Sequence, residues 1–113
     1  SNTCVACGSC EYVCPTCFCF DMYDEIIVSD KTSLRDAEDN AKIRRRFWDA
    51  CIFAQFYGEH VPCFEERFIN RYICKFVTLK ERFERLGCTG CGRCILVCPG
   101  GIDLREVLSK LAE

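Results

Sequence analysis

Near its start the chain reads Cys4-Val-Ala-Cys7-Gly-Ser-Cys10-Glu-Tyr-Val-Cys14-Pro15, and the same spacing returns near its end as Cys88-Thr-Gly-Cys91-Gly-Arg-Cys94-Ile-Leu-Val-Cys98-Pro99. Eight of the 13 cysteines belong to these two runs. A cubane 4Fe-4S cluster needs one thiolate at each of four irons, and a Cys-x-x-Cys-x-x-Cys loop can wrap three of them while a more distant cysteine supplies the fourth. The residues that let backbone N–H groups turn toward the sulfides are small: Ala6, Gly8, Ser9, Thr89, Gly90 and Gly92. The repeat therefore predicts two 4Fe-4S clusters.

Two other uses of so many cysteines are disfavoured. A secreted disulfide framework would leave one thiol of the odd count of 13 unpaired, and its cysteines would be more dispersed. Two zinc sites would also use Cys-x-x-Cys pairs, but the third cysteine at the same step and the Cys-Pro ending are features of clusters. Zinc remains the alternative metal.

Length and charge narrow the class of protein. A domain of 113 residues buries only about two thirds of the surface of its unfolded chain, so bound metal is expected to stabilise it. The formal charge is -2, and two oxidised clusters of about -2 each would bring it to about -6, which argues against a nucleic-acid partner. No apolar run has the length of a membrane span and no signal peptide precedes Cys4, so we expect a cytoplasmic domain. The start at Ser1, without methionine, suggests a domain excised from a longer protein.

The fourth cysteine of each run is expected to cross over. In two-cluster ferredoxins this residue ligates the cluster of the other run. The expected ligands are Cys4, Cys7, Cys10 and Cys98 for cluster 1, and Cys88, Cys91, Cys94 and Cys14 for cluster 2. The fold class predicted is α+β: a single domain, 1–113, with a ferredoxin-like two-cluster body. Its parts are the cluster motifs 4–19 and 88–99, a largely helical insertion 20–87 and a C-terminal helix 103–112.

Patterns in the insertion predict local structure. Alternating apolar residues in 18–28 indicate a short hairpin that turns near Asp24-Glu25. The charged segment 30–46 indicates a solvated helix or loop, or else a docking patch at its basic run Lys42 to Arg46. The helical spacing of Trp48, Ile52 and Phe56 indicates a short helix ending at Gly58.

A longer helix is predicted from Pro62, with an aromatic stripe from Phe64 to Leu86 that faces the core and a C-terminal cap at Gly87. Asp103 is expected to cap the last helix. His60, the single histidine, is expected at the surface rather than at a metal or as an acid-base catalyst.

Three further elements carry a resemblance to a known family: Cys14-Pro-Thr-Cys17-Phe-Cys19, Trp48-Asp-Ala-Cys51 and Arg71-Tyr-Ile-Cys-Lys-Phe76. With the cluster motifs, they make nearly the whole chain resemble the iron-sulfur beta subunits of NAD(P)-linked nickel-iron sulfhydrogenases and the related A subunit of anaerobic sulfite reductase, which are longer. The resemblance implies a subunit of an anaerobic oxidoreductase that relays electrons between a flavin subunit, which meets NAD(P)H, and a catalytic core.

The same resemblance bears on the five remaining cysteines. The family usually has a histidine where this chain has Cys74, and histidine and cysteine exchange at iron-sulfur ligand positions. A third 4Fe-4S cluster would then use Cys17, Cys19, Cys51 and Cys74. Cys63 lies about 16 Å from Cys74 along a helix at about 1.5 Å per residue, so one cluster cannot take both, and Cys63 is expected to be a buried thiol. The alternative is that all five pack as small apolar residues.

These features predict an electron-transfer module and no catalytic residue of its own. An enzyme that uses a cluster as Lewis acid or radical initiator needs an iron with an open site, and both runs are complete. The alternative function is a structural or redox-sensing module stabilised by its clusters.

Overall fold

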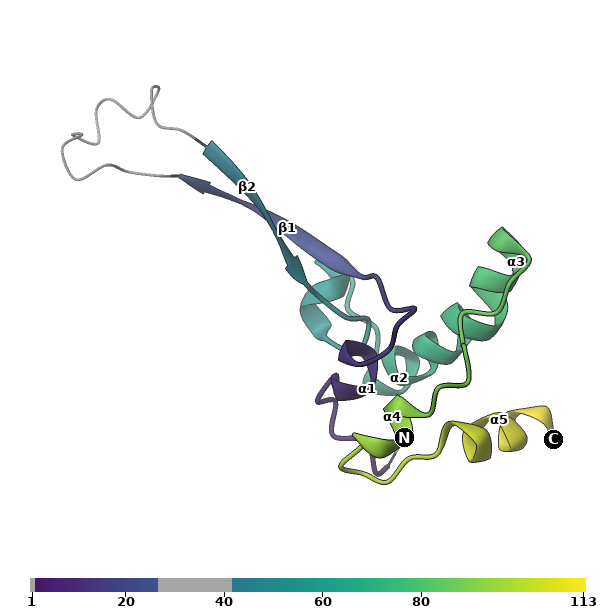
Figure 1. Ribbon diagram of the computed structural model, residues 1–113. Coiled ribbons are helices and arrows are strands. Elements are labelled where there is room, and N and C mark those ends of the chain that lie inside the picture. The colour runs from purple at the N-terminus through teal and green to yellow at the C-terminus, as the bar shows by residue number, and fades with distance from the viewer. Residues whose placement is uncertain (1, 27–41) are drawn as a thin grey trace, which may run out of the picture. The chain divides into compact units, whose positions relative to one another are not determined.

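The computed structural model describes residues 2–26 and 42–113; the remaining residues are drawn as a thin grey trace (Figure 1). The chain divides into two compact units. One comprises the residues up to Cys19 together with Ala50–Glu113, and so includes both cysteine runs, and the other is Phe20–Asp49. Helices and a small sheet together agree with the predicted α+β class.

The second unit is a two-stranded antiparallel sheet of β1 (Phe20–Ile26) and β2 (Lys42–Trp48). Both strands contain apolar and aromatic residues that favour strands, interspersed with charged residues. Phe20 pairs with Trp48 at one end and Ile26 with Lys42 at the other. Across the strands, Arg44 Nε lies 2.8 Å from Asp24 Oδ1, which neutralises charges that would otherwise oppose pairing.

The hairpin predicted within 18–28 is wrong. β1 continues through Asp24 and Glu25 without turning and pairs with β2. The two carboxylates form ion pairs across the strands, Asp24 with Arg44 and Glu25 with Arg45, and these pairs favour the strand over a turn. The predicted helix or loop at 30–46 is also wrong where it can be compared, since 42–46 is strand; residues 30–41 lie outside the described part.

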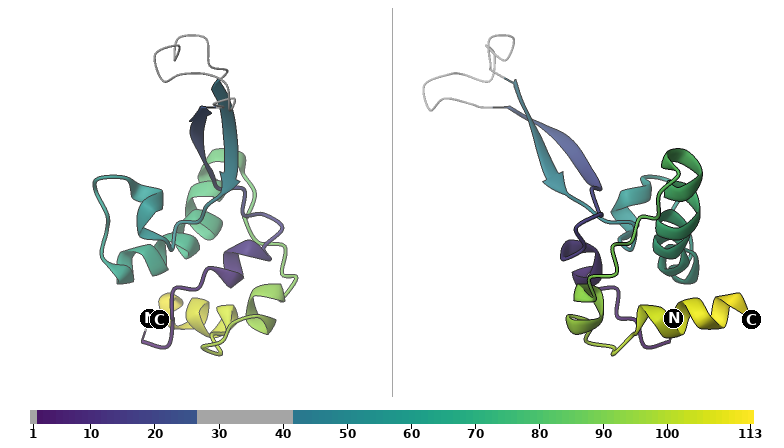
Figure 2. Two further views of the ribbon diagram at one scale, coloured as in Figure 1. Left: turned by 90° about the vertical axis from the view of Figure 1, so that its left-hand side faces the viewer. Right: turned by 45° about the vertical axis from the view of Figure 1, so that its right-hand side comes forward.

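In the first unit, the two cysteine runs fold alike. Each contains a one-turn helix, α1 (Ser9–Tyr12) or α4 (Arg93–Leu96), and the two helices contact each other (Figures 1 and 2). Each helix follows a glycine in the left-handed conformation, Gly8 with φ 73° and Gly92 with φ 75°. A residue with a Cβ would be strained there by about 1–2 kcal/mol, so the Cys-Gly step is what allows the loop to reverse into the helix.

The segment after Ala50 begins with the short 3-10 helix η2 (Ala54–Tyr57), which ends at Gly58 as predicted. Its predicted start was wrong, because Trp48 belongs to β2. Cys63 precedes the next helix at its N-cap and is exposed, so the prediction of a buried thiol is wrong as well. His60 is exposed, as predicted.

The long helix forms as predicted and continues through three pieces: α2 (Phe64–Ile73), the π-helical turn η3 (Cys74–Thr78) and α3 (Leu79–Phe83). It ends earlier than Gly87, because Glu84 takes the left-handed conformation with φ 56°. Gly87 instead packs against the helix, where a Cβ would lie 2.4 Å from Leu79 Cδ1. The last helix, α5 (Leu104–Ala112), is capped as predicted, with Arg105 N donating to Asp103 Oδ1 at 2.8 Å.

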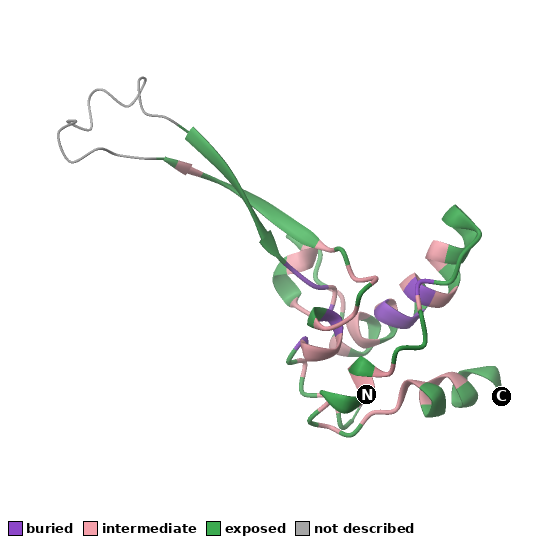
Figure 3. Ribbon diagram, viewed as in Figure 1, coloured by how far each residue is buried: buried purple, intermediate pink, exposed green. Residues whose placement is uncertain are grey.

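The interior holds few apolar side chains. Among the described residues the buried ones are Ala50, Ile52 and Tyr72 (Figure 3). Of the predicted aromatic stripe, Tyr72 is buried whereas Phe83 is 64% exposed. Charged side chains are buried in the same unit instead: Glu11, Arg71 and Lys75. No helix in the described ranges is both long and apolar enough to cross a membrane.

Candidate metal centres

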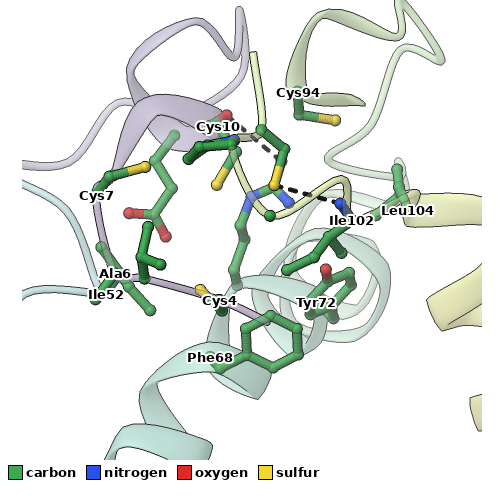
Figure 4. A pocket seen from close by; sticks show the side chains of 17 residues that line it. Cys4, Ala6, Cys7, Cys10, Ile52, Phe68, Tyr72, Cys94, Ile102 and Leu104 are labelled. Atoms are coloured by element: carbon green, nitrogen blue, oxygen red, sulfur yellow. Dashed lines mark hydrogen bonds between the residues drawn. The ribbon is translucent and has the colours of Figure 1, made fainter. Parts of the chain in front are cut away.

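One cavity of the first unit gathers cysteines from both ends of the chain. It is lined by Cys4, Cys7 and Cys10 of the first run and by Cys94 and Cys98 of the second. Figure 4 shows this cavity, with Cys4, Cys7, Cys10 and Cys94 labelled. Close packing of the two loops explains the meeting, since a Cβ on Gly100 would lie 2.3 Å from the Thr3 carbonyl oxygen. Four of these five cysteines, Cys4, Cys7, Cys10 and Cys98, are the set predicted for cluster 1, which needs one thiol for each iron of a cubane.

A second cavity is lined by Cys14, Cys88, Cys91 and Cys94. Here the Thr16 hydroxyl donates to the Gly87 carbonyl oxygen at 2.5 Å, which ties the loop after Cys14 to the residue before Cys88. This is the set predicted for cluster 2. Cys94 borders both cavities, so the two groups of thiols are neighbours.

The surroundings of these thiols suit a cluster. The first cavity has an apolar wall, made by Ile52 before η2, by Phe68 and Tyr72 of α2, and by Ile102 and Leu104 at or just before the start of α5. Backbone N–H groups point at sulfur in both groups, from Ile102 to Cys98 Sγ and from Gly90 to Cys88 Sγ, each at 3.4 Å. Such hydrogen bonds and the exclusion of water are what a protein uses to tune an iron-sulfur cluster.

Two buried cations lie beside the cysteines, and the sequence reasoning missed both. Arg71 and Lys75 are one turn apart on the long helix and only 8% and 3% exposed. Lys75 Nζ donates to Thr16 Oγ1 at 2.9 Å and to the Gly87 carbonyl oxygen at 3.2 Å. Arg71 Nη2 donates to the Cys10 carbonyl oxygen at 3.5 Å. The four-residue spacing in Arg71-Tyr-Ile-Cys-Lys75 was the available signal.

The thiol pKa values follow these contacts. Burial raises the pKa of Cys10 to about 11 and that of Cys17 to about 12. Burial also acts to raise the pKa of Cys14, but the Thr16 hydroxyl and the Lys75 ammonium together bring it down to about 7. Because iron binds thiolate rather than thiol, Cys14 is the thiol of these three best prepared as a ligand.

A third group forms from cysteines outside the two runs. Cys51 Sγ donates to Glu11 Oε1 at 3.0 Å, and burial, this hydrogen bond and the nearby Cys19 and Cys17 all raise the Cys51 pKa. Cys17, Cys19 and Cys51 are thus brought together. Cys74, the first residue of η3, is partly exposed.

Glu11 was not predicted to take part in any site. It is 3% exposed, borders the first cavity and leaves Oε2 without a hydrogen-bond partner among the described residues. The equivalent position in the second run is Ile95, so a comparison of the two repeats would have singled Glu11 out. Within 2–26 and 42–113, no group of three or more His, Cys, Asp or Glu side chains converges closely enough for a single metal ion.

Gly100→Ala should impair the first centre. Its Cβ would meet the backbone of Thr3, next to Cys4, and such overpacking destabilises by about 1–3 kcal/mol. We expect faster loss of iron and a lower unfolding temperature. Gly101→Ala is the matched control, since nothing lies within 4 Å of its Cβ and only its φ of 63° is strained. Equal effects of the two substitutions would contradict the close approach of the loops.

Comparison with known proteins supports the interpretation of this chain as a 4Fe-4S protein. A family described as 4Fe-4S dicluster domain matches residues 3–102. The chain is also 35% identical, over 118 aligned positions, to sulfhydrogenase 2 subunit beta of Pyrococcus furiosus; the alignment takes in all of this chain and 32% of that protein. The chain thus spans about a third of the length of this curated relative. No solved structure matches it significantly. Because the family match spans both cysteine runs, the chain belongs to the 4Fe-4S dicluster domains, the iron-sulfur domains of electron transfer.

Proposed function

We propose that the chain relays single electrons through two 4Fe-4S clusters, one held by Cys4, Cys7, Cys10 and Cys98 and the other by Cys88, Cys91, Cys94 and Cys14. The observation that carries this proposal is the exchange of the last cysteine: each cavity is lined by the first three cysteines of one run and by the fourth cysteine of the other, and Cys94 lines the first cavity as well. Four thiolates at each centre leave no iron open to a substrate, which favours electron transfer over catalysis.

When bound, the clusters supply reversible one-electron chemistry. The chain's own residues hold and insulate them. Ile52, Phe68 and Tyr72 exclude water from the first cavity, and the N–H groups of Gly90 and Ile102 stabilise charge on the ligand sulfurs. Cys94 borders both cavities, which supports a short path between the centres.

Each proposed centre also has exposed residues beside it. Cys7 and Cys91 are exposed, and the last residues of the two equivalent helices, Tyr12 and Leu96, are 71% and 86% exposed. These patches suit protein partners that deliver and accept electrons. By analogy with the sulfhydrogenase subunit, we propose a cytoplasmic complex in which one partner is a flavin subunit that meets NAD(P)H and the other a catalytic oxidoreductase core.

The relay is tested with the anaerobically purified, iron-loaded chain. It should be reduced by dithionite or a low-potential flavoprotein and pass the electrons on, without turning over hydrogen, sulfite or NAD(P)H by itself. Turnover at a rate that tracks iron content would overturn the relay. Clusters that support folding but exchange no electrons would favour the structural or redox-sensing alternative.

The basic run Lys42 to Arg46 offers less free positive charge for docking a partner than its sequence suggests. Arg44 and Arg45 pair with Asp24 and Glu25, and Arg46 lies over the Phe20 ring, 4.9 Å from its centroid. Lys42 and Arg46 therefore carry the charge left for an acidic neighbour.

Replacing Lys42 and Arg46 together with glutamate should weaken complex formation by the purified subunits several-fold at low salt, with less effect at high salt and none on cluster content. Lys110→Glu, at an exposed position of α5, is the control for charge alone. Unchanged affinity in a binding titration of the double variant would remove the basic run from the interface.

We also propose a third 4Fe-4S cluster at Cys17, Cys19, Cys51 and Cys74. The proximity of Cys51 to Cys17 and Cys19 supports three of these ligands, and Cys74 rests on the family position alone. The hydrogen bond between Cys51 and Glu11 sets a condition for this third cluster. Cys51 donates to Glu11 only as a thiol, so its ligation as thiolate requires Glu11 to take up a proton or turn away.

Cys51→Ala should lower the iron content by about four per chain and remove one EPR signal, while the other two signals persist. Cys74→Ala should do the same, and Cys74→His should retain a cluster of raised potential, because a neutral imidazole replaces a thiolate. Cys63→Ala, at an exposed cysteine, should change neither quantity. Full iron content in Cys51→Ala would exclude the third cluster.

A further inference from the structure

Arg71 and Lys75 are buried charges without a carboxylate partner among the residues that the structure describes. Burying a charge is unfavourable unless an opposite charge or strong hydrogen bonds compensate it. Lys75 donates to two oxygens, but the Arg71 Nε is buried without a hydrogen-bond partner. Compensation for these cations therefore has to come from negative charge of another kind.

The negative groups that face them are the cysteine sulfurs. Lys75 Nζ donates to Thr16 Oγ1, which itself lies 3.3 Å from the Cys14 sulfur, and Arg71 lines both cavities together with Cys94. Burial acts to lower the pKa values of both cations, but the sulfurs of Cys14 and Cys17 raise that of Lys75, and the sulfurs of Cys10 and Cys94 raise that of Arg71. Arg71 borders both cavities, whereas Lys75 borders only the second. Each cation is thus directed at a particular centre.

Resting on the proposed function, we infer that Arg71 and Lys75 set the reduction potentials of the two centres: Lys75 raises that of the centre of Cys14, Cys88, Cys91 and Cys94, and Arg71 raises those of both. Reduction by one electron adds one negative charge to a centre. A fixed cation nearby stabilises the reduced form more than the oxidised form, and the effect is largest where water is excluded. Neither residue touches a substrate, so both are tuning residues.

The experiment is an EPR-monitored redox titration of the iron-loaded chain and its variants. In Lys75→Met, at a fixed applied potential, the ratio of reduced to oxidised second centre should fall about tenfold or more, which for one electron is a lowering of about 59 mV. The first centre should change less. Arg71→Gln should lower both centres. Lys75→Arg and Arg71→Lys, which keep the charge, should restore most of the potential.

Lys80→Met is the matched control, since Lys80 lies on α3 and is exposed. The inference is overturned if Lys75→Met and Arg71→Gln keep their iron and their unaltered potentials. It is also overturned if both neutral variants lose their iron while the charge-retaining variants keep it, because the cations would then serve assembly. Redox signals in the unaltered chain would leave the relay itself standing in either case.

Discussion

Cys14→Ala should abolish the second of the two proposed clusters, for which we propose Cys88, Cys91 and Cys94, at the opposite end of the chain, as the other three ligands. The reason is geometric: Cys14 lines the cavity of these cysteines, and Thr16 and Lys75 fasten its loop to Gly87 beside them. Loss of a thiolate from a complete cubane should remove about four irons per chain and one of the low-temperature EPR signals. The cluster of Cys4, Cys7, Cys10 and Cys98 should persist.

Cys98→Ala is the reciprocal test and should remove the cluster of Cys4, Cys7 and Cys10. Cys63→Ala controls for the loss of a cysteine as such, because Cys63 is exposed and lines neither cavity. If Cys14→Ala instead damages the cluster of Cys4, Cys7 and Cys10 alone, each run holds its own cluster and the crossed arrangement is wrong.

Removal of iron should unfold most of the chain. The buried apolar side chains of the described residues number three, Ala50, Ile52 and Tyr72, which is too small a core for a domain of 113 residues. Without clusters, the buried cations Arg71 and Lys75 would also lose the charge that compensates them. In small metal-dependent zinc domains the binding free energy that becomes folding free energy is on the order of 10 kcal/mol, and an effect of this class is expected here.

Circular dichroism before and after anaerobic chelation measures this effect. The helical signal should fall sharply and the cooperative thermal transition should disappear, and both should return on reconstitution with iron and sulfide. An iron-free chain that still unfolds cooperatively, at an unchanged temperature, would show that the apolar contacts suffice and that the clusters are not the main source of stability.

The cysteine spacing predicted an iron-sulfur domain, which the family match confirms, because ligand geometry is a local constraint: the Cys-x-x-Cys loops and their glycines occupy a few successive residues. The strand pairing was missed because it joins Phe20–Ile26 to Lys42–Trp48, a contact between distant segments that no local pattern encodes. In addition, the three consecutive arginines of β2, Arg44, Arg45 and Arg46, interrupt any alternation typical of a strand, so this stretch was interpreted as a solvated surface.

The burial of charged side chains also could not be predicted from the sequence. Charged side chains are rarely buried, so nothing in the sequence indicated that Glu11, Arg71 and Lys75 lie inside the protein, and only the folded arrangement brings them close to the cysteines. Cys63 shows the reverse error. As a small apolar thiol it was expected inside, yet its position before the first turn of α2 leaves it exposed.

A stoichiometric reductive titration, combined with iron and sulfide analysis of one anaerobic sample, tests the two-cluster electron-transfer domain most directly. We predict about eight iron and eight sulfide per chain and uptake of about two electrons, or about twelve of each and three electrons if the third cluster is present, at one electron for each four irons. Zinc without sulfide, or iron that takes up no electrons from dithionite, would contradict the account.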